Sequence, residues 1–237
     1  MSYPITQSFI PGLPKLPYRN GFGAYEGVVC HATANYNDSA TGERNYEATT
    51  YNNAFVHFFV DDQNIIQVAD TNYLAWGCGS IGNKRFVQIE LCQTYDSEKF
   101  KNAYARYVWL IAKILKDKNL GVKDGGSLVS HAWVTKNLGG TTHQEPIDYL
   151  ASYDVSWNQL VNDVTMQYNG AGFLCTIEVQ CETDVRAEAS HTSGYITNAH
   201  KGNIFNVIQE KNGFYQVALT DYTRGWIDKS NTMVIYS

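Results

Sequence analysis

The pattern of apolar and polar residues predicts short buried strands in the first half of the chain. Residues 25–31 and 85–92 are each a run of mostly apolar residues with the length of one buried strand. Residues 55–70 hold two apolar runs around the polar stretch 61–64, which predicts two strands joined by a turn. Residues 1–25 are rich in Pro, Gly and Tyr, so we expect an extended, loop-like start.

Helical spacing is clearest over residues 96–119, where Asp96 or Ser97 can cap the first turn. The apolar positions that recur there are Phe100, Ala103, Tyr104, Tyr107, Val108, Ile111, Ile114 and Leu115. Shorter helices are predicted over 45–54 and 154–168. Because strands alternate with helices, we expect an α/β domain with a central mixed sheet flanked by helices.

The pattern changes after residues 167–173, a segment that contains glycines. Short β-type runs follow, separated by turn signals such as Asn212-Gly213, and no helical period is present. We therefore predict two domains: an α/β domain over 1–168 and a small all-β barrel over 169–237.

Composition fits a globular protein of two domains. The chain has 237 residues, 44% of them apolar, and a formal net charge of −5, which argues against a general nucleic-acid binder. No apolar run has the length of a membrane span, and the first residues lack the pattern of a signal peptide. The five cysteines contain no CxxC pair and are expected to be reduced thiols; Cys175 and Cys181 pair only if the fold places them suitably.

Polar residues able to carry chemistry follow several of the predicted strands. His31 ends one apolar run, Glu90 lies near the end of another, and His131 follows a third; the stretch 142–146 adds His143 and Glu145. A zinc hydrolase needs a few imidazole or anionic ligands, one open position for water, and gains from a nearby carboxylate. These residues can meet only if the fold brings neighbouring strand ends together. From spacing alone, His31 remains either a core histidine or a ligand, Glu90 a salt-bridging residue or a base, and His131 a helix-cap partner or a ligand.

Several segments, in order, resemble the type 2 N-acetylmuramoyl-L-alanine amidase family, which includes wall amidases and peptidoglycan recognition proteins. They are EGVVCHATAN, AFVHFFVDDQNIIQVAD, AWGCG, FVQIELCQT, VSHAWVTKN and THQEPIDYL, and the resemblance covers about residues 20–165. The later segments TDVRAEAS, YITNAHKGNIFNVIQEKNGFYQVAL and RGWID are similar to bacterial SH3-type (SH3b) domains. The combination resembles a phage endolysin.

This resemblance implies cleavage of the amide between the muramoyl group and L-Ala, with Zn²⁺ as cofactor. His31 and His131 match the family's histidine ligands, and Glu145 stands where the family usually has Cys or Asp before a proline. His143 stands where a lysine often stabilises the oxyanion, or it is the third ligand with Glu145 behind it. Glu90 matches the acidic residue beside the water and is assigned as general base and then acid.

Two positions depart from the family pattern. His57 lacks the tyrosine that often precedes it, so it either lines the pocket or packs within the sheet. Gly77 stands where relatives often have a histidine, and no catalytic role is assigned to that loop.

The resemblance also implies bacterial peptidoglycan as the partner, with no nucleic acid and no membrane anchor; the sequence sets no oligomeric state. We expect synthesis in the bacterial host cytoplasm without a signal peptide, and action on the wall either after release, as through a holin, or from outside. In the second domain, wall contact is expected from exposed aromatic residues, among them Tyr195, Tyr222 and Trp226, although most aromatics there could form the core.

Two other classes of function remain open at this point. A protein of the same superfamily can bind peptidoglycan without cutting it. A cysteine peptidase would use Cys30 or Cys92 with a histidine, but Cys30 and His31 are adjacent on a strand and point to opposite faces.

Overall fold

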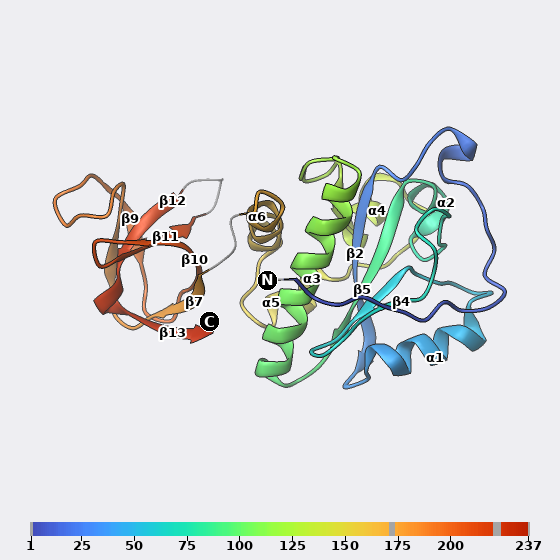
Figure 1. The fold of residues 1–237 in the computed structure, drawn as a ribbon, viewed down its shortest axis with the longest axis horizontal. Coiled ribbons are helices and arrows are strands. Elements are labelled where there is room, and N and C mark those ends of the chain that lie inside the picture. The colour runs from blue at the N-terminus through green and yellow to red at the C-terminus, as the bar shows by residue number, and fades with distance from the viewer. Residues whose placement is uncertain (1, 171–173, 220–223, 237) are drawn as a thin grey trace. The chain divides into compact units, whose positions relative to one another are not determined.

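The computed structural model describes residues 2–170, 174–219 and 224–236. The chain divides into two compact units, 1–164 and 165–237, each built on a sheet of its own (Figure 1). Helix α6 (Trp157–Tyr168) runs across this division. Within the described residues, none of the helices has the length and apolar character that crossing a bilayer requires.

The first unit is a six-stranded mixed sheet with helices on both faces. Its strands lie in the order β1, β4, β3, β5, β2, β6, and only the β3–β4 pair is antiparallel. The strands are β1 (Thr6–Gln7), β2 (Gly27–Tyr36), β3 (Phe58–Val60), β4 (Ile65–Gln67), β5 (Phe86–Gln93) and β6 (Leu128–Ser130). The helices are η1 (Tyr18–Gly21), α1 (Ala40–Thr50), α2 (Gly79–Asn83), α3 (Ser97–Asp117), α4 (His131–Asn137) and α5 (Ile147–Ala151).

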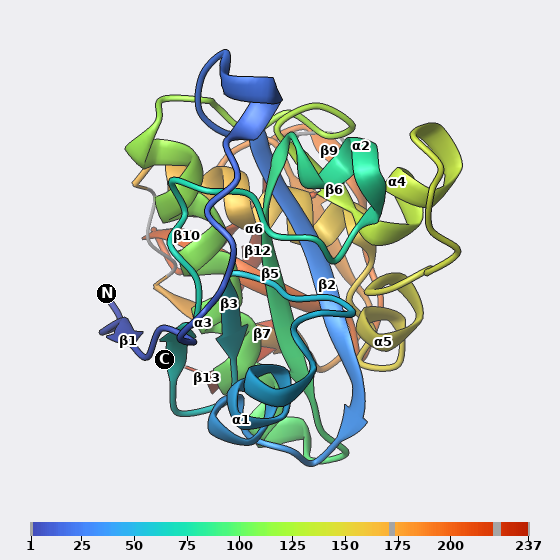
Figure 2. The same cartoon turned by 90° about the vertical axis from the view of Figure 1, so that its right-hand side faces the viewer.

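The long helix α3 covers one face of the sheet, and α1 lies against the other (Figures 1 and 2). Asp96 caps α3 by accepting hydrogen bonds from the backbone N–H groups of its first turn. From within α3, the buried Tyr107 hydroxyl donates to the carbonyl oxygens of His31, at 2.9 Å, and Ile89, at 3.3 Å. These bonds fix α3 to the two central strands β2 and β5. Helix α3 therefore supports the strand that carries His31.

The predicted architecture of the first unit is confirmed, but helix boundaries differ from those expected. Helix α1 begins at Ala40, five residues before the predicted start, because the Ser39 hydroxyl caps it by accepting from Gly42 N–H. The short helices α2, α4 and α5 were not predicted; each is too short to show a clear 3.6-residue period.

The second unit is a seven-stranded, all-antiparallel sheet, in agreement with the predicted all-β barrel. Its order is β13, β7, β10, β11, β12, β8, β9. The elements are β7 (Cys175–Val179), β8 (Thr183–Arg186), β9 (Tyr195–Ala199), β10 (Ile204–Lys211), β11 (Phe214–Ala218), β12 (Arg224–Asp228), η3 (Lys229–Asn231) and β13 (Thr232–Tyr236). Its core includes Ile177, Val185, Val207, Val217 and Ile227.

The aromatic residues expected to contact the wall divide by burial. Tyr195 is exposed, whereas Trp226 is only 7% exposed, so the prediction of a wall-contacting Trp226 is wrong. Successive strand residues alternate between the two faces, yet Gly225, Trp226 and Ile227 are all buried, so β12 is covered on both faces at this point. No local sequence pattern marks such a strand. Tyr222 lies outside the described residues.

The five cysteines form no disulfide among the described residues. Cys30, Cys78, Cys92 and Cys175 are buried and Cys181 is exposed. Burial raises the pKa of the Cys30 thiol to about 12. Because Cys30 is fully buried, a substrate cannot reach its thiol, and the raised pKa disfavours the thiolate that a cysteine peptidase requires.

Candidate metal centre

The sheet brings His31 and His131 together although they are 100 positions apart in the chain. Three fully buried residues, Val28 to Cys30, fix β2 up to His31. Strand β6 pairs in parallel with β2, so that Ser130 lies beside Cys30 and His131 follows as the first residue of α4. The two imidazole rings meet edge to face, with centroids 4.5 Å apart.

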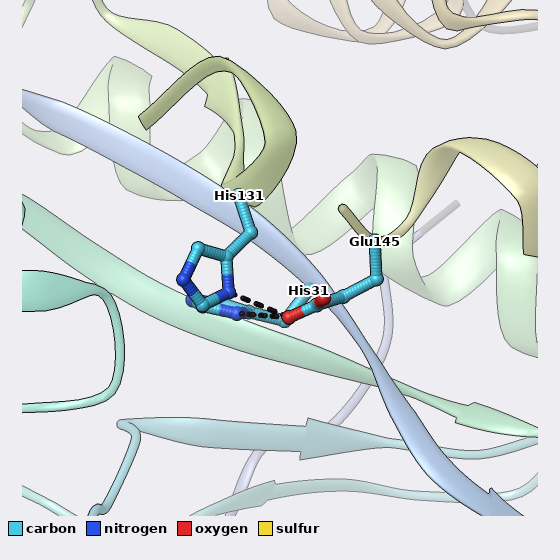
Figure 3. A group of neighbouring side chains, drawn as sticks. All are labelled: His31, His131 and Glu145. Atoms are coloured by element: carbon cyan, nitrogen blue, oxygen red, sulfur yellow. Dashed lines mark hydrogen bonds and ion pairs between the residues drawn. The ribbon is translucent and has the colours of Figure 1, made fainter. Parts of the chain in front are cut away.

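Glu145 completes a group of three potential metal ligands (Figure 3). Its Oε1 lies 2.5 Å from Nδ1 of His131 and 3.3 Å from Nδ1 of His31. Its backbone carbonyl accepts a hydrogen bond of 3.2 Å from Ala132 N–H, which ties the segment before α5 to the first turn of α4. One ligand atom from each of the three residues lies within 4.8 Å of the other two.

The electrostatics of this group suit a divalent cation. Burial lowers the pKa of His31 to about 4, so the imidazole is neutral and has a lone pair to give. Burial alone would raise the pKa of Glu145, but the hydrogen bonds from His131 and His31 outweigh it and lower the pKa below its ordinary value. Two imidazoles and one carboxylate form a donor set used by hydrolytic zinc sites. The residues present therefore fit Zn²⁺.

Glu90 lies next to this group on the same face of the sheet. It is paired in register with His31 across β2 and β5, and paired residues of neighbouring strands project to the same side. Its Oε2 is buried and has no hydrogen-bond partner among the described residues. Burial, and then the charge of Glu145, raise the pKa of the Glu90 carboxyl well above its usual range.

An open cleft of about 570 Å³ adjoins the group. Its lining comes from loops and from the start of α2, and consists of Ala54, Trp76, Gly77, Gly79, Gly140, Thr141, Thr142 and His143. Thr141 connects this cleft to the histidines, because its hydroxyl lies 2.8 Å from Nε2 of His131. A carboxylate, two imidazoles and an adjoining cleft are the parts that hydrolysis of an amide requires.

Comparisons with known proteins agree with this arrangement. Residues 21–148 match the family described as N-acetylmuramoyl-L-alanine amidase. The chain belongs to the N-acetylmuramoyl-L-alanine amidase family. Residues 182–232 match the bacterial SH3 domain.

The chain is also similar to longer bacterial proteins. The chain is 42% identical over 160 residues to Protein Ami of Listeria monocytogenes, a match that covers 65% of this chain. It is 35% identical over 217 residues to the bifunctional autolysin of Staphylococcus aureus, covering 89% of this chain. In both cases the match spans only 17% of the relative's own length.

Two solved structures share the fold of the first unit. The Staphylococcus aureus hydrolase AmiA, solved in complex with its ligand, is 38% identical with a TM-score of 0.68, covering 71% of this chain and 84% of that one. The catalytic domain of XlyA is 25% identical with a TM-score of 0.54, covering 68% of this chain and 99% of that one.

His143 lies at the outer side of the three-residue group. Its ring stacks on that of His131, with centroids 5.0 Å apart, and its Nδ1 lies 3.4 Å from Oε2 of Glu145. The side chain is 67% exposed, so it faces the cleft and solvent. The geometry among the described residues brings Glu145, and not His143, between the two buried histidines.

His57 is fully buried and does not line the cleft, which corrects the suggestion that it is a pocket residue. Its Nδ1 accepts a hydrogen bond of 3.0 Å from Gln88 N–H, and its Nε2 lies 2.9 Å from the Tyr73 carbonyl oxygen and 3.0 Å from the Tyr18 hydroxyl. Burial lowers the pKa of His57 to about 4. The residue is therefore a neutral core histidine that ties β3 to its neighbours.

Sequence reasoning did not find Thr141. A threonine in a glycine-rich loop has no local pattern that marks it as a partner of a distant histidine. Only the fold shows that its hydroxyl holds the ring nitrogen of His131 that points away from Glu145.

Proposed function

We propose that the chain is a zinc-dependent peptidoglycan hydrolase that cleaves the amide between N-acetylmuramic acid and the L-Ala of the stem peptide. The observation that supports this most directly is the convergence of His31, His131 and Glu145 beside Glu90, next to a cleft that His143 lines. Zn²⁺, when bound, supplies a Lewis acid for the scissile carbonyl and lowers the pKa of water.

His31 and His131 would hold the cation through their imidazole nitrogens, and Glu145 through a carboxylate oxygen. Thr141 bonds Nε2 of His131, and this contact sets the orientation of the ring so that Nδ1 faces Glu145. Because His31 is buried, its position depends on the rigid strand β2 and not on a loop.

Glu90 is proposed as the general base and then the general acid. A carboxylate whose pKa is raised accepts a proton from water more readily than an ordinary carboxylate does, and the protonated carboxyl can then donate that proton to the departing amine. Its buried, unpartnered Oε2 is the oxygen that could make this transfer.

His143 is proposed to stabilise the oxyanion. Its exposed imidazole can reach a bound substrate and donate a hydrogen bond to the carbonyl oxygen as negative charge develops there.

The second unit is proposed to attach the enzyme to the wall, as bacterial SH3 domains accompany wall hydrolases. Together with the amidase unit, this supports an endolysin-type or autolysin-type enzyme. A bacteriophage origin and release from the cytoplasm of the host are part of the same proposal.

The test is an end-group analysis of purified bacterial walls treated with the full chain. We expect new N-terminal alanine and no new reducing sugar, and we expect His31→Ala to abolish both the release and stoichiometric zinc. His191→Ala, an exposed histidine of the second unit, serves as the matched control. Binding to walls without any new amine would instead indicate a non-catalytic peptidoglycan-binding protein.

A further inference from the structure

Two tyrosines, one at the end of β2 and one just after β5, stack on each other and remain open to solvent. Tyr36 is the last residue of β2, and Tyr95 lies two residues after the end of β5. Their rings are nearly parallel, with centroids 4.2 Å apart and planes 10° from each other. The exposed fractions are 39% for Tyr36 and 73% for Tyr95. Neighbouring exposed aromatics of this kind mark an interaction surface more often than isolated ones do.

The backbone around the pair is built to hold it. The side-chain oxygen of Asn37 accepts hydrogen bonds of 3.4 Å from Tyr95 N–H and from the Thr94 hydroxyl. Its own N–H donates to the Gln93 carbonyl at 2.8 Å. Asn37 has a φ of 63°, a left-handed conformation that Asn adopts more readily than most residues. The loop after β2 is thus fastened to the segment after β5, which sets the two rings face to face.

A buried aromatic ring supports the pair from below. The edge of Tyr36 packs on Tyr149 of α5, with centroids 6.1 Å apart and planes at 85°. Tyr149 is 4% exposed, and its hydroxyl accepts from Thr94 N–H at 3.0 Å and donates to the Cys92 carbonyl at 3.4 Å. The exposed pair therefore packs, through Tyr36, against a buried residue of the core.

A small polar cavity of about 90 Å³ lies beside the residues that adjoin the pair. Its lining residues include Asn37, Asp38, Gln93 and Thr94, whose side chains carry amide, carboxylate and hydroxyl groups. Such groups bind hydroxyls, and flat aromatic faces suit an apolar surface. A pyranose ring presents both: a face of C–H groups and a rim of hydroxyls.

The pair lies on the same strands as the candidate metal centre. Tyr36 follows His31 by five residues on β2, and Tyr95 follows Glu90 by five residues on and after β5. At about 3.3 Å per residue, each tyrosine is at most about 16 Å along the strand from the centre, a span of a few sugar rings. Strand β2 is irregular between Ala32 and Tyr36, so the side to which Tyr36 projects is not set by simple alternation from His31. Contact with the pair requires a polymer that leaves the centre toward the carboxyl ends of β2 and β5.

We propose that Tyr36 and Tyr95 form a stacking platform for a sugar ring of the glycan strand, one or more rings away from the muramoyl group being cleaved. The proposal rests on the proposed function, because that function supplies the glycan as part of the substrate. The platform would favour long glycan chains over short fragments.

The test compares two substrates of the full chain. One is a muramoyl peptide with a single sugar, and the other is an uncrosslinked glycan chain that carries the same stem peptide at many repeats. We expect Tyr95→Ala to raise KM for the long chain about three- to tenfold, because one aromatic contact with the sugar is lost. The kcat for the long chain, and both KM and kcat for the single-sugar substrate, should not change. Tyr95→Phe should keep the wild-type KM, because the ring and not the hydroxyl does the stacking.

Tyr46→Ala is the matched control, since Tyr46 is a 66% exposed tyrosine on α1. Equal KM values for wild type and Tyr95→Ala on the long chain would overturn the platform. An equal rise for the single-sugar substrate would also overturn it, since the pair would then contact the peptide.

Binding of peptide-free glycan strands to the full chain separates this proposal from the proposed function. If the wild type cleaves neither substrate, the proposed function fails, but the platform still predicts weaker glycan binding by Tyr95→Ala than by Tyr46→Ala. Equal binding by the two variants would overturn it.

Discussion

Glu90 places an ionisable carboxyl in a buried position beside the candidate metal centre. Its carboxyl lies beside His31 in the sheet, with one oxygen that has no partner among the described residues. Leaving a buried carboxyl oxygen unpaired destabilises the fold, and the proposed role in proton transfer would give this oxygen a partner during the reaction.

Changing this carboxyl to an amide should separate catalysis from metal binding. Glu90→Gln keeps the shape of the side chain but removes the basic oxygen, so we expect zinc to bind in full while turnover falls by about 10²- to 10⁴-fold. Release of N-terminal alanine and metal analysis measure the two effects. Glu98→Gln, an exposed change on α3, should alter neither. Wild-type turnover by Glu90→Gln would exclude the assigned role.

Burial of His57 should lower the free energy of unfolding of the first unit as the pH falls below neutral. Its pKa is about 4 in the folded protein, against an ordinary value of 6.5. Between these values the unfolded chain binds the extra proton and the folded chain does not. Stability is therefore fully present above about pH 6.5 and falls as the pH drops to about 4, by up to about 3 kcal/mol.

Urea unfolding followed by tryptophan fluorescence at pH 7.5 and pH 5 checks this effect. His57→Gln should reduce the loss of stability between the two pH values, leaving the part that His31 contributes. His191→Gln, at an exposed site, should leave the pH dependence as it is. A loss that is the same in His57→Gln and wild type would show that His57 does not cause it.

At the scale of elements, the start of α4 determines where His131 lies. The Ser130 hydroxyl caps this helix by accepting from Trp133 N–H at 3.0 Å, and His131 is the next residue. A capping serine contributes about 1 kcal/mol to the free energy of unfolding.

Ser130→Ala should lower this free energy by about 1 kcal/mol and also weaken zinc binding, because the first turn of α4 loses its anchor. Ser156→Ala is the matched control: Ser156 accepts from Gln159 N–H at 3.1 Å at the start of α6, away from the three ligands. It should reduce stability by a similar amount without changing zinc affinity. Thermal unfolding and zinc titration measure the two quantities, and equal zinc affinities in the two variants would contradict the expectation.

Helices whose apolar residues recur at helical spacing could be predicted from the sequence. Helices whose bounds depend on polar contacts could not. Helix α3 follows from its apolar spacing, whereas the inward side of α1 carries the buried carboxyls Glu43 and Glu47, so its first turns show no apolar face. Helix α4 depends on the Ser130 cap and has only seven residues. The roles of His31, Glu90, His131 and Glu145 came from the resemblance, because no spacing rule joins residues that meet through parallel strand pairing.

At the scale of the whole molecule, the proposed work is divided between two units with separate cores. The candidate centre is formed entirely by the first unit, and the second has its own apolar cluster around Ile227. Ile227→Ala should destabilise that cluster by about 2–5 kcal/mol. We expect weaker retention on purified walls in a sedimentation assay but unchanged hydrolysis of a single-sugar muramoyl peptide. Loss of both together would show that the units do not act separately.

The central claim is that His31, His131 and Glu145 hold one zinc ion on which amide cleavage depends. The most direct measurement is the rate of N-terminal alanine release from walls as Zn²⁺ is added back to the chelator-treated full chain. We predict no release without metal and a rise that ends at one equivalent of Zn²⁺ per chain, with no such rise in His131→Ala. Undiminished release by the metal-free chain would contradict the account.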